Sequence, residues 1–251
     1  MKIVINGGTG LIGSKTVGRL RSAGHDVVAA SPQSGVNSVT GEGVADAMKG
    51  AQVIVDLSNS PSWEDAAVLE FFQKSTSNLL AAAMANNIKH YVALSVVGTD
   101  RLQASGYFVA KLAQETLIKK SGVPYTIVHA TQFFDLLDFL VRSWGLGNKV
   151  VVPAALIQPI APDDVADVMA EVALAAPRNS TLEIAGPERF HIRDLVVKYL
   201  AATGDDRVVE PSADAPYSGA KLEETTLVSD NNPRVGRIDF DQWFQSRTQA
   251  S

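Results

Sequence analysis

The chain has 251 residues, of which 46% are hydrophobic and 20% are charged, a composition typical of soluble globular proteins rather than of disordered ones. Its net charge of -5 and its pI near 5.4 disfavour direct binding to DNA or RNA, because a phosphate backbone attracts basic surfaces. The sequence contains no cysteine, which excludes disulfides, thiolate metal sites and cysteine nucleophiles.

An apolar strand is predicted to begin at residue 2, and no uninterrupted apolar run approaches the length that spans a membrane. We therefore expect a cytoplasmic protein with no signal peptide and no membrane association. The four histidines show no spacing typical of metal ligands, so we expect no metal site.

The N-terminal stretch predicts a seat for the pyrophosphate of a dinucleotide. Residues 2–5 form a β-branched run typical of a strand buried on both faces, and a G-x-x-G-x-x-G motif follows it before a helix over 11–23. The glycines permit a tight turn, a close approach of the backbone to phosphate and close packing of the helix on the strand. The helix N-terminus then offers unpaired N–H groups to the anion. A glycine-rich turn that binds nothing is the alternative. The expected contacts come from Gly7, Thr9, Gly10, Leu11, Ile12 and Gly13.

The residues after the second predicted strand, over 27–30, bear on the choice of cofactor. An NAD site of this kind places a carboxylate there, about 20 residues beyond the glycines. This chain has Ser31, Gln33 and Ser34 instead, so a 2′-phosphate meets hydroxyls and an amide and no repelling carboxylate. We therefore expect NADP to be preferred, with NAD as the alternative because the usual arginine is also missing. A plain polar turn would have the same sequence.

Strands and helices alternate regularly up to residue 130. Further strands are predicted over 52–56, 91–95 and 125–130, and helices over 44–49, 62–86 and 106–120. Ser62 and Asp65 resemble a capping box at the start of the helix over 62–86. This alternation predicts an α/β protein with a Rossmann-type, doubly wound parallel sheet. Ligands bind at the carboxyl ends of such strands, so Leu57, Ser58 and Asn59 are expected beside the adenosine.

After residue 131 the pattern predicts a smaller α+β lobe. Its expected elements are a helix that begins at 132, extended segments over 149–152, 156–160 and 182–184, and helices from 162 and over 191–202. We expect a single NAD(P)-binding domain over 1–251, with 1–130 as the dinucleotide-binding core and about 131–251 as the substrate-side lobe on a shared core. The long helices from Ser62 and Ser105 are candidates for a homodimer face.

Three residues are candidates for catalysis. Tyr107 and Lys111 lie four residues apart on one face of the helix over 106–120, and Ser95 ends the strand before it. A lysine ammonium beside a phenol favours the phenolate, and a serine hydroxyl can hold a substrate carbonyl. Tyr107 could then deliver a proton while a nicotinamide delivers a hydride.

The loop over 96–104 and the residues after the fifth strand are expected on the substrate side. His129 either lines the substrate pocket as a donor or caps a strand with its ring bonded to backbone. The residues expected to face a substrate are Val97, His129, Gln132 and Phe133.

These motifs together resemble the short-chain dehydrogenase/reductase superfamily, and more closely its atypical, NmrA-like branch. The resemblance covers about residues 1–205, and its ordered pieces are 7–13, Ser95 within 94–98, 107–111, 122–128 and 158–166. It implies NADP or NAD bound across the top of the sheet, with Tyr107 as the acid/base, Lys111 on the ribose and Ser95 orienting the substrate. His129 and the missing arginine after Ser31 depart from the pattern of the family.

We therefore expect an NAD(P)-dependent oxidoreductase that prefers NADPH and reduces a small carbonyl, enone or quinone. The resemblance also leaves open a protein that binds NADP(H) without turnover and acts as a redox sensor on a protein partner. A sugar-nucleotide epimerase or dehydratase would use the same tyrosine and lysine.

Overall fold

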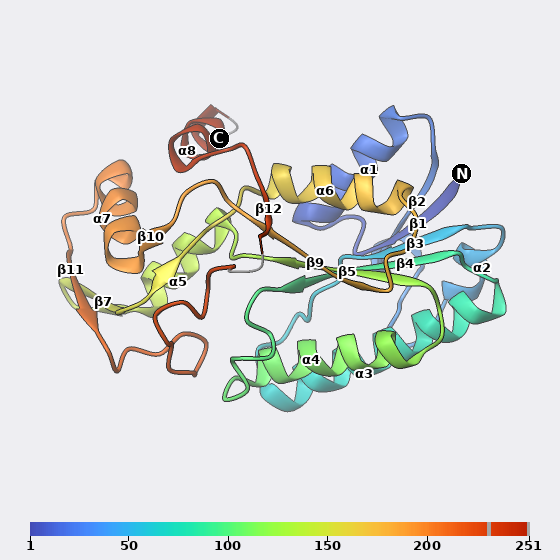
Figure 1. The fold of residues 1–251 in the computed structure, drawn as a ribbon, viewed down its shortest axis with the longest axis horizontal. Helices are drawn as coiled ribbons and strands as arrows, with labels where there is room; N and C mark the ends of the chain where they lie inside the picture. The colour runs from blue at the N-terminus through green and yellow to red at the C-terminus, as the bar shows by residue number, and fades with distance from the viewer. Residues whose placement is uncertain (230–231, 250–251) are drawn as a thin grey trace. The chain divides into compact units, whose positions relative to one another are not determined.

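The computed structural model describes residues 1–229 and 232–249. Its largest sheet has seven strands in the order β12-β9-β5-β4-β3-β1-β2 (Figure 1). The pairs β1–β2, β1–β3, β3–β4 and β9–β12 are all parallel, so the predicted Rossmann-type sheet is confirmed. The strands are β1 Lys2–Asn6, β2 Asp26–Ala30, β3 Val53–Asp56, β4 His90–Val96, β5 Tyr125–Ala130, β9 Ser180–Ala185 and β12 Arg234–Val235.

The chain divides into two compact units, each assembled from separate segments. The first holds residues 1–95, 106–129 and 165–182. The second holds residues 96–105, 130–164 and the described residues from 183 onward. The first unit therefore contains the glycine motif and the three candidate catalytic residues.

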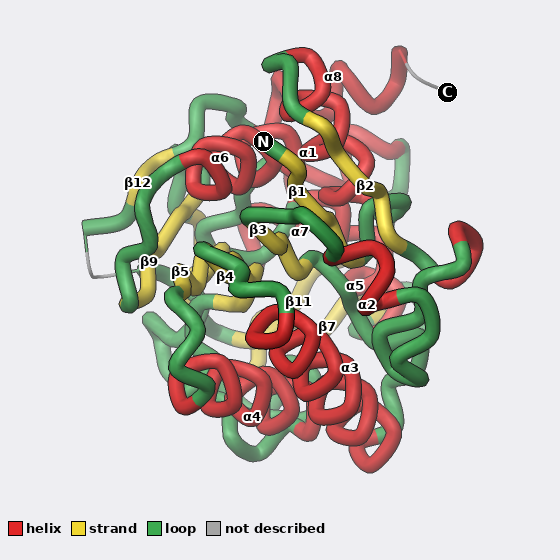
Figure 2. Tube along the Cα trace, turned by 90° about the vertical axis from the view of Figure 1, so that its right-hand side faces the viewer, coloured by secondary structure: helices red, strands yellow, loops and turns green. Residues whose placement is uncertain are grey.

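Helices cover both faces of the sheet in the first unit. Helices α1 (Leu11–Ser22) and α6 (Pro162–Leu174) lie on one face, and α3 (Asp65–Ala85) and α4 (Gly106–Lys120) lie side by side on the other (Figure 2). Arg19 of α1 forms an ion pair with Asp167 of α6. A short helix, α2 (Val44–Met48), precedes β3. Within the described parts of the chain, no helix combines the length and apolarity needed to cross a membrane.

The core beneath α3 follows from the apolar periodicity of that helix. Leu79, Leu80 and Ala83 are buried and pack in one cluster with Ile54 of β3 and Tyr91 of β4. Residues three and four apart share a helix face, so these positions form one apolar stripe against the sheet. Burial of this stripe holds α3 against the sheet.

The second unit contains two smaller sheets. One has the order β11-β7-β6, and in the other β8 pairs antiparallel with β10. Phe134 stacks on Trp243, whose indole N–H donates to Asp135 at 3.1 Å. The elements are η1 Pro32–Ser34 in the first unit, and η2 Phe134–Leu136, α5 Leu137–Ser143, β6 Gly145–Leu146, β7 Lys149–Pro153, β8 Leu156–Ile157, β10 Phe190–His191, α7 Ile192–Thr203, β11 Val208–Ser212 and α8 Phe240–Gln249 in the second.

Two predicted helix starts are wrong. The capping box at Ser62 does not form, because Ser62 Oγ accepts from Glu64 N at 3.1 Å and α3 begins at Asp65 with Glu64 as its N-cap. The helix expected from residue 132 begins as the short 3₁₀ helix η2 at Phe134, since backbone pairing with Ile160 holds the two residues before it extended.

We expect Leu79→Ala to lower the free energy of unfolding by about 2–5 kcal/mol, because Leu79 is 1% exposed and its truncation leaves a cavity. Met84 lies on the same helix and is 53% exposed, so Met84→Ala should change the same quantity by less than about 0.5 kcal/mol. Urea unfolding followed by circular dichroism measures both. Equal losses in the two variants would contradict the placement of α3.

Candidate functional site

The glycine motif forms a tight turn between β1 and α1. The N–H groups of Gly7 and Gly8 donate to Ala30 O at 3.0 and 3.1 Å, which fastens the turn to the end of β2. A Cβ on Gly13 would lie 2.0 Å from Gly7 O, so no larger residue fits there. Gly7 has φ +75, and a Cβ on it would lie 2.8 Å from Leu57 O. The turn therefore needs glycine at both positions, as the dinucleotide motif predicts.

The turn after β2 leaves one hydroxyl without a partner. Ser34 Oγ accepts from Ser31 N at 2.9 Å and lies 3.1 Å from Ala29 O, so it holds the turn together. Ser31 is 3% exposed, and its Oγ has no hydrogen-bond partner among the described residues. Gln33 is exposed on the same turn. A buried hydroxyl normally has a partner, so Ser31 is the residue of this turn whose geometry favours a ligand.

The residues at the end of β3 are also held by hydrogen bonds. Ser58 Oγ donates to Asp56 Oδ1 at 2.7 Å, and Asn59 Oδ1 accepts from Ser60 N at 3.0 Å. Leu57 N donates to Asn6 O at 2.9 Å, so this loop lies directly beside the glycine turn. The three residues expected beside the adenosine thus adjoin the predicted pyrophosphate seat.

Tyr107 lies in an aromatic cluster between α3 and α4. Its ring centroid is 5.6 Å from Trp63, 6.2 Å from Phe72 and 5.6 Å from Phe108. Burial raises the pKa of Tyr107 to about 12, so the phenol is protonated at neutral pH. The phenolate-favouring effect expected from Lys111 is not found, because desolvation dominates the environment of the phenol.

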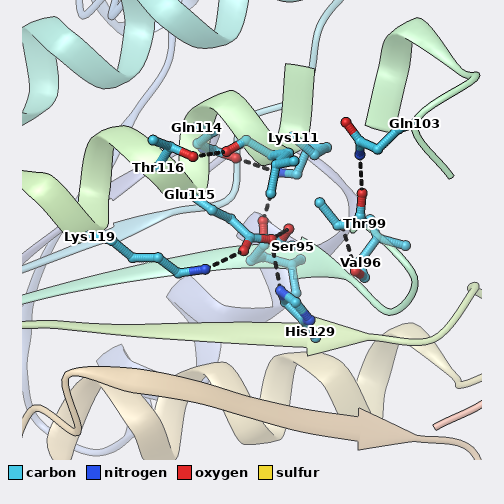
Figure 3. A network of polar contacts seen from close by, with 12 residues as sticks. Ser95, Val96, Thr99, Gln103, Lys111, Gln114, Glu115, Thr116, Lys119 and His129 are labelled. Carbon is cyan, nitrogen blue, oxygen red and sulfur yellow. Dashed lines mark hydrogen bonds and ion pairs between the residues drawn. The ribbon is translucent and has the colours of Figure 1, made fainter. Parts of the chain in front are cut away.

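Lys111 is buried with its ammonium at the end of β4. Nζ donates to Leu94 O at 2.9 Å and to Gln114 Oε1 (Figure 3). Burial lowers the pKa of Lys111 to about 8, and the charges of Asp56 and Glu115 oppose that change. Lys111 is therefore still mainly charged at neutral pH, and its acceptor Leu94 directly precedes Ser95 in β4.

A second carboxylate, Glu115, organises the candidate catalytic serine. Ser95 Oγ donates to Glu115 Oε1 at 2.7 Å, and His129 Nε2 lies 2.7 Å from the same oxygen (Figure 3). Lys119 Nζ donates to Glu115 Oε2 at 3.0 Å. The hydroxyl hydrogen of Ser95 thus points to the carboxylate, so Ser95 offers only oxygen lone pairs to a ligand in this arrangement. His129 bonds a carboxylate, which neither sequence interpretation included.

The cluster around Glu115 keeps that carboxyl group ionised. Burial opposes ionisation, but hydrogen bonds from His129, Ser95 and Lys119 and the charge of His129 outweigh it and hold the pKa of Glu115 at about 2. Both Ser95 and His129 bond the carboxylate, an order that differs from serine hydrolases, in which the histidine lies between. This cluster positions Ser95 rather than making it a nucleophile.

The remaining substrate-side candidates lie in the second unit. Val97 is fully buried, and Phe133 forms a bridge with Ile160. Gln132 is 3% exposed, and neither atom of its amide has a hydrogen-bond partner in the described chain. Thr131 Oγ1, one residue before it, is also buried and unpartnered there. Buried amides rarely stay unpaired, so Gln132 is the candidate of this unit that best fits a ligand contact.

Sequence reasoning missed Asp56, Gln114 and Glu115 as site residues. A usable signal existed, since Gln114 and Glu115 lie three and four residues after Lys111 and so share its helix face. Asp56 ends a buried strand, where a charged residue needs a partner.

Comparison with known proteins gives one family match and several relatives. The model of the family described as NAD(P)H-binding matches residues 7–176. The photosystem II assembly factor Ycf39 of Cyanophora paradoxa is 26% identical over 212 residues, which make up 79% of this chain and 60% of that protein. The chain thus spans less than two thirds of the length of this relative.

Solved structures resemble the chain over nearly its whole length. MoeE5 in complex with UDP-glucose and NAD is 18% identical, with a TM-score of 0.75 and coverage of 100% of both chains. The GDP-mannoheptose C4 reductase MlghC of Campylobacter jejuni with NADP bound is 15% identical, with a TM-score of 0.71 and coverage of 99% of this chain and 97% of that one. At such identities, the likeness establishes the fold.

We expect Gly13→Ala to abolish dinucleotide binding, because its Cβ would displace Gly7 O from the turn. Gly18 lies on the same helix with no atom within 4 Å of its Cβ position, so Gly18→Ala should bind dinucleotides normally. The measurement is the rise in melting temperature with NADP, NAD and their reduced forms, because a ligand at about 100 times its Kd adds roughly 2.7 kcal/mol. Equal shifts for both variants would contradict a role of the turn in binding.

Acid stability tests the cluster around Glu115. The folded pKa of about 2 is below the ordinary 4.5, so ionisation of Glu115 stabilises the fold above pH 4.5, and this contribution is lost as pH falls through 2. Glu115→Gln should lower the free energy of unfolding at pH 7 by about 3 kcal/mol and remove its part of the loss below pH 4.5.

Glu70 serves as the matched control for that experiment, since it is exposed and pairs with Lys74 on the surface of α3. Glu70→Gln should change stability far less, because surface ion pairs contribute little. Urea unfolding at pH 7, 5 and 3.5 measures both variants. A Glu115→Gln protein that follows the wild-type pH profile would show that the carboxylate is not held as described.

Proposed function

Since the chain belongs to the NAD(P)H-binding family, we propose that it is an NAD(P)H-dependent oxidoreductase that reduces a small carbonyl, enone or quinone, with NADPH preferred. We base this on one observation: Lys111, on the helix that carries Tyr107, donates to the carbonyl of Leu94, the residue directly before Ser95 in β4. These three residues and the glycine turn belong to the same unit.

The residues of the first unit fit the cofactor. Gly7 and Gly13 form a turn that any Cβ would fill, and Ser31 carries a buried hydroxyl with no partner among the described residues. In our proposal the turn holds the pyrophosphate, Ser31 contacts the 2′-phosphate of NADPH, and Lys111 holds the ribose next to the nicotinamide. The cofactor would supply a hydride to the substrate carbon.

The protein's own contribution is a proton. Tyr107 is protonated across the neutral range, since burial raises its pKa to about 12, and a protonated phenol can donate to a substrate oxygen. Ser95 donates its hydroxyl hydrogen bond to Glu115, so we propose Tyr107 as the donor to a substrate carbonyl. Ser95 would accept a hydrogen bond from a ligand O–H or N–H.

We expect Tyr107→Phe to lower turnover by about two orders of magnitude or more while the Kd for the dinucleotide changes little, because only a general acid is lost. Tyr125→Phe removes the hydroxyl of a half-buried tyrosine at the start of β5 that has no proposed role in the reaction, and it should leave turnover unchanged. Steady-state kinetics with NADPH and a panel of carbonyl and quinone acceptors measures turnover, and calorimetry measures Kd. Unchanged turnover in Tyr107→Phe would remove the proposed role.

A second function is a dinucleotide-binding protein that passes the state of its cofactor to a protein partner. Two observations favour it, the enclosure of Tyr107 among aromatic rings and the similarity to a protein named as an assembly factor. The same acceptor panel separates the two functions. Dinucleotide binding without NADPH oxidation by any acceptor would favour the binding protein.

A nucleotide sugar is a further substrate class to include, because two structural relatives are a GDP-mannoheptose C4 reductase and a protein bound to UDP-glucose. Conversion of such a substrate, with none of the small acceptors reduced, would replace the proposed substrate class and keep the proposed roles of Tyr107 and Lys111.

A further inference from the structure

A buried carboxylate at the end of β3 accepts hydrogen bonds from four side chains. Asp56 is 1% exposed, and its Oδ1 accepts from Asn6 Nδ2 at 2.9 Å and from Ser58 Oγ at 2.7 Å. Its Oδ2 accepts from Tyr91 Oη and from Gln114 Nε2, both at 3.0 Å. The donors come from β1, β4, α4 and the loop after β3, so Asp56 ties four segments of the first unit together.

Gln114 is the member of this network that reaches a candidate catalytic residue. Its Nε2 donates to Asp56 Oδ2, while its Oε1 accepts from Lys111 Nζ. A primary amide has a donor and an acceptor on adjacent atoms, so it can bridge an ammonium and a carboxylate. Leucine, which has a similar size, can do neither.

The ammonium of Lys111 makes two further contacts besides its hydrogen bond to Gln114. Nζ also donates to Leu94 O at 2.9 Å and lies 4.5 Å from the centroid of the Phe72 ring. Lys111 is 3% exposed and Gln114 is 1% exposed, so water cannot readily replace a lost partner. An ammonium that loses one of two strong acceptors in such surroundings must reorient or lose its proton.

We infer that Gln114 is a positioning residue that holds the Lys111 ammonium in place by tying it to Asp56. The inference rests on the proposed role of Lys111 toward the cofactor ribose. Gln114 acts only through its hydrogen bond with Lys111 and contacts neither substrate nor cofactor itself. Tyr91 donates to the same oxygen of Asp56, so it shares the structural role of Gln114 without the link to Lys111.

That shared oxygen supplies a matched pair of variants. Gln114→Leu and Tyr91→Phe each remove one hydrogen bond to Asp56 Oδ2, and each should lower the melting temperature. Only Gln114→Leu frees Lys111. The ligands are NADPH, which carries the nicotinamide ribose, and 2′,5′-ADP, which lacks it, and calorimetry gives the Kd of each.

We expect Gln114→Leu to weaken NADPH binding by about tenfold while the Kd for 2′,5′-ADP stays within about twofold, because a hydrogen bond to a charged group is of that strength. Tyr91→Phe should change neither Kd by more than about twofold. Lys111→Met should reproduce the loss in Gln114→Leu, and the double variant should bind NADPH no more weakly than Lys111→Met alone.

The same binding measurements distinguish a failure of the proposed cofactor site from a failure of the role of Gln114. A wild-type protein that binds neither ligand overturns the proposed cofactor site and this inference with it. A wild type that binds both, with Gln114→Leu and Tyr91→Phe equally impaired or with additive losses in the double variant, overturns the role of Gln114 alone.

Discussion

The burial of three charged side chains is the constraint on which the first unit depends. Lys111, Asp56 and Glu115 are each 3% exposed or less, and a charge removed from water costs several kcal/mol unless it is paired and hydrogen bonded. The structure meets this cost with amide, hydroxyl and imidazole partners on α4 and on the strands beneath it. Helix α4 is therefore fixed to the sheet by polar contacts as well as by apolar packing.

The same constraint decides what the site can offer a ligand. Ser95 donates a hydrogen bond to Glu115, and Lys111 donates two of its three possible hydrogen bonds to Leu94 and Gln114, so the serine keeps its lone pairs and the ammonium keeps one N–H for a ligand. Tyr107 differs from these residues, because its ring packs against the aromatic rings of Trp63 and Phe72 and burial is the cause of its raised pKa. Tyr107 keeps its proton at neutral pH, and the fixed charges of Lys111 and Glu115 lie on the same helix.

Much of the first unit was predictable from local pattern. The bounds of α4 and β5 agree with the predicted ranges, and the predicted NAD(P)-binding family and Rossmann-type sheet are confirmed. Helix and strand periodicities carry this information within a few neighbouring residues. The strands β11 and β12 and the helix α8 were not predicted. The two strands form by pairing with distant segments near residues 150 and 184. No pattern within so short a strand reveals such pairing.

The candidate site was predictable only in part, for a related reason. Glycine spacing and the Tyr107–Lys111 pair are local signals, whereas the burial of Glu115 is a tertiary property, and a carboxylate on an amphipathic helix ordinarily faces water. What distinguishes Glu115 is its place four residues after a lysine that itself faces the sheet. Once Lys111 is assigned to the ligand side of α4, Gln114 and Glu115 share its face and must find partners there. When a helix carries a buried lysine of a candidate catalytic pair, the polar residues three and four positions after that lysine are therefore the first places to look for its hydrogen-bond partners.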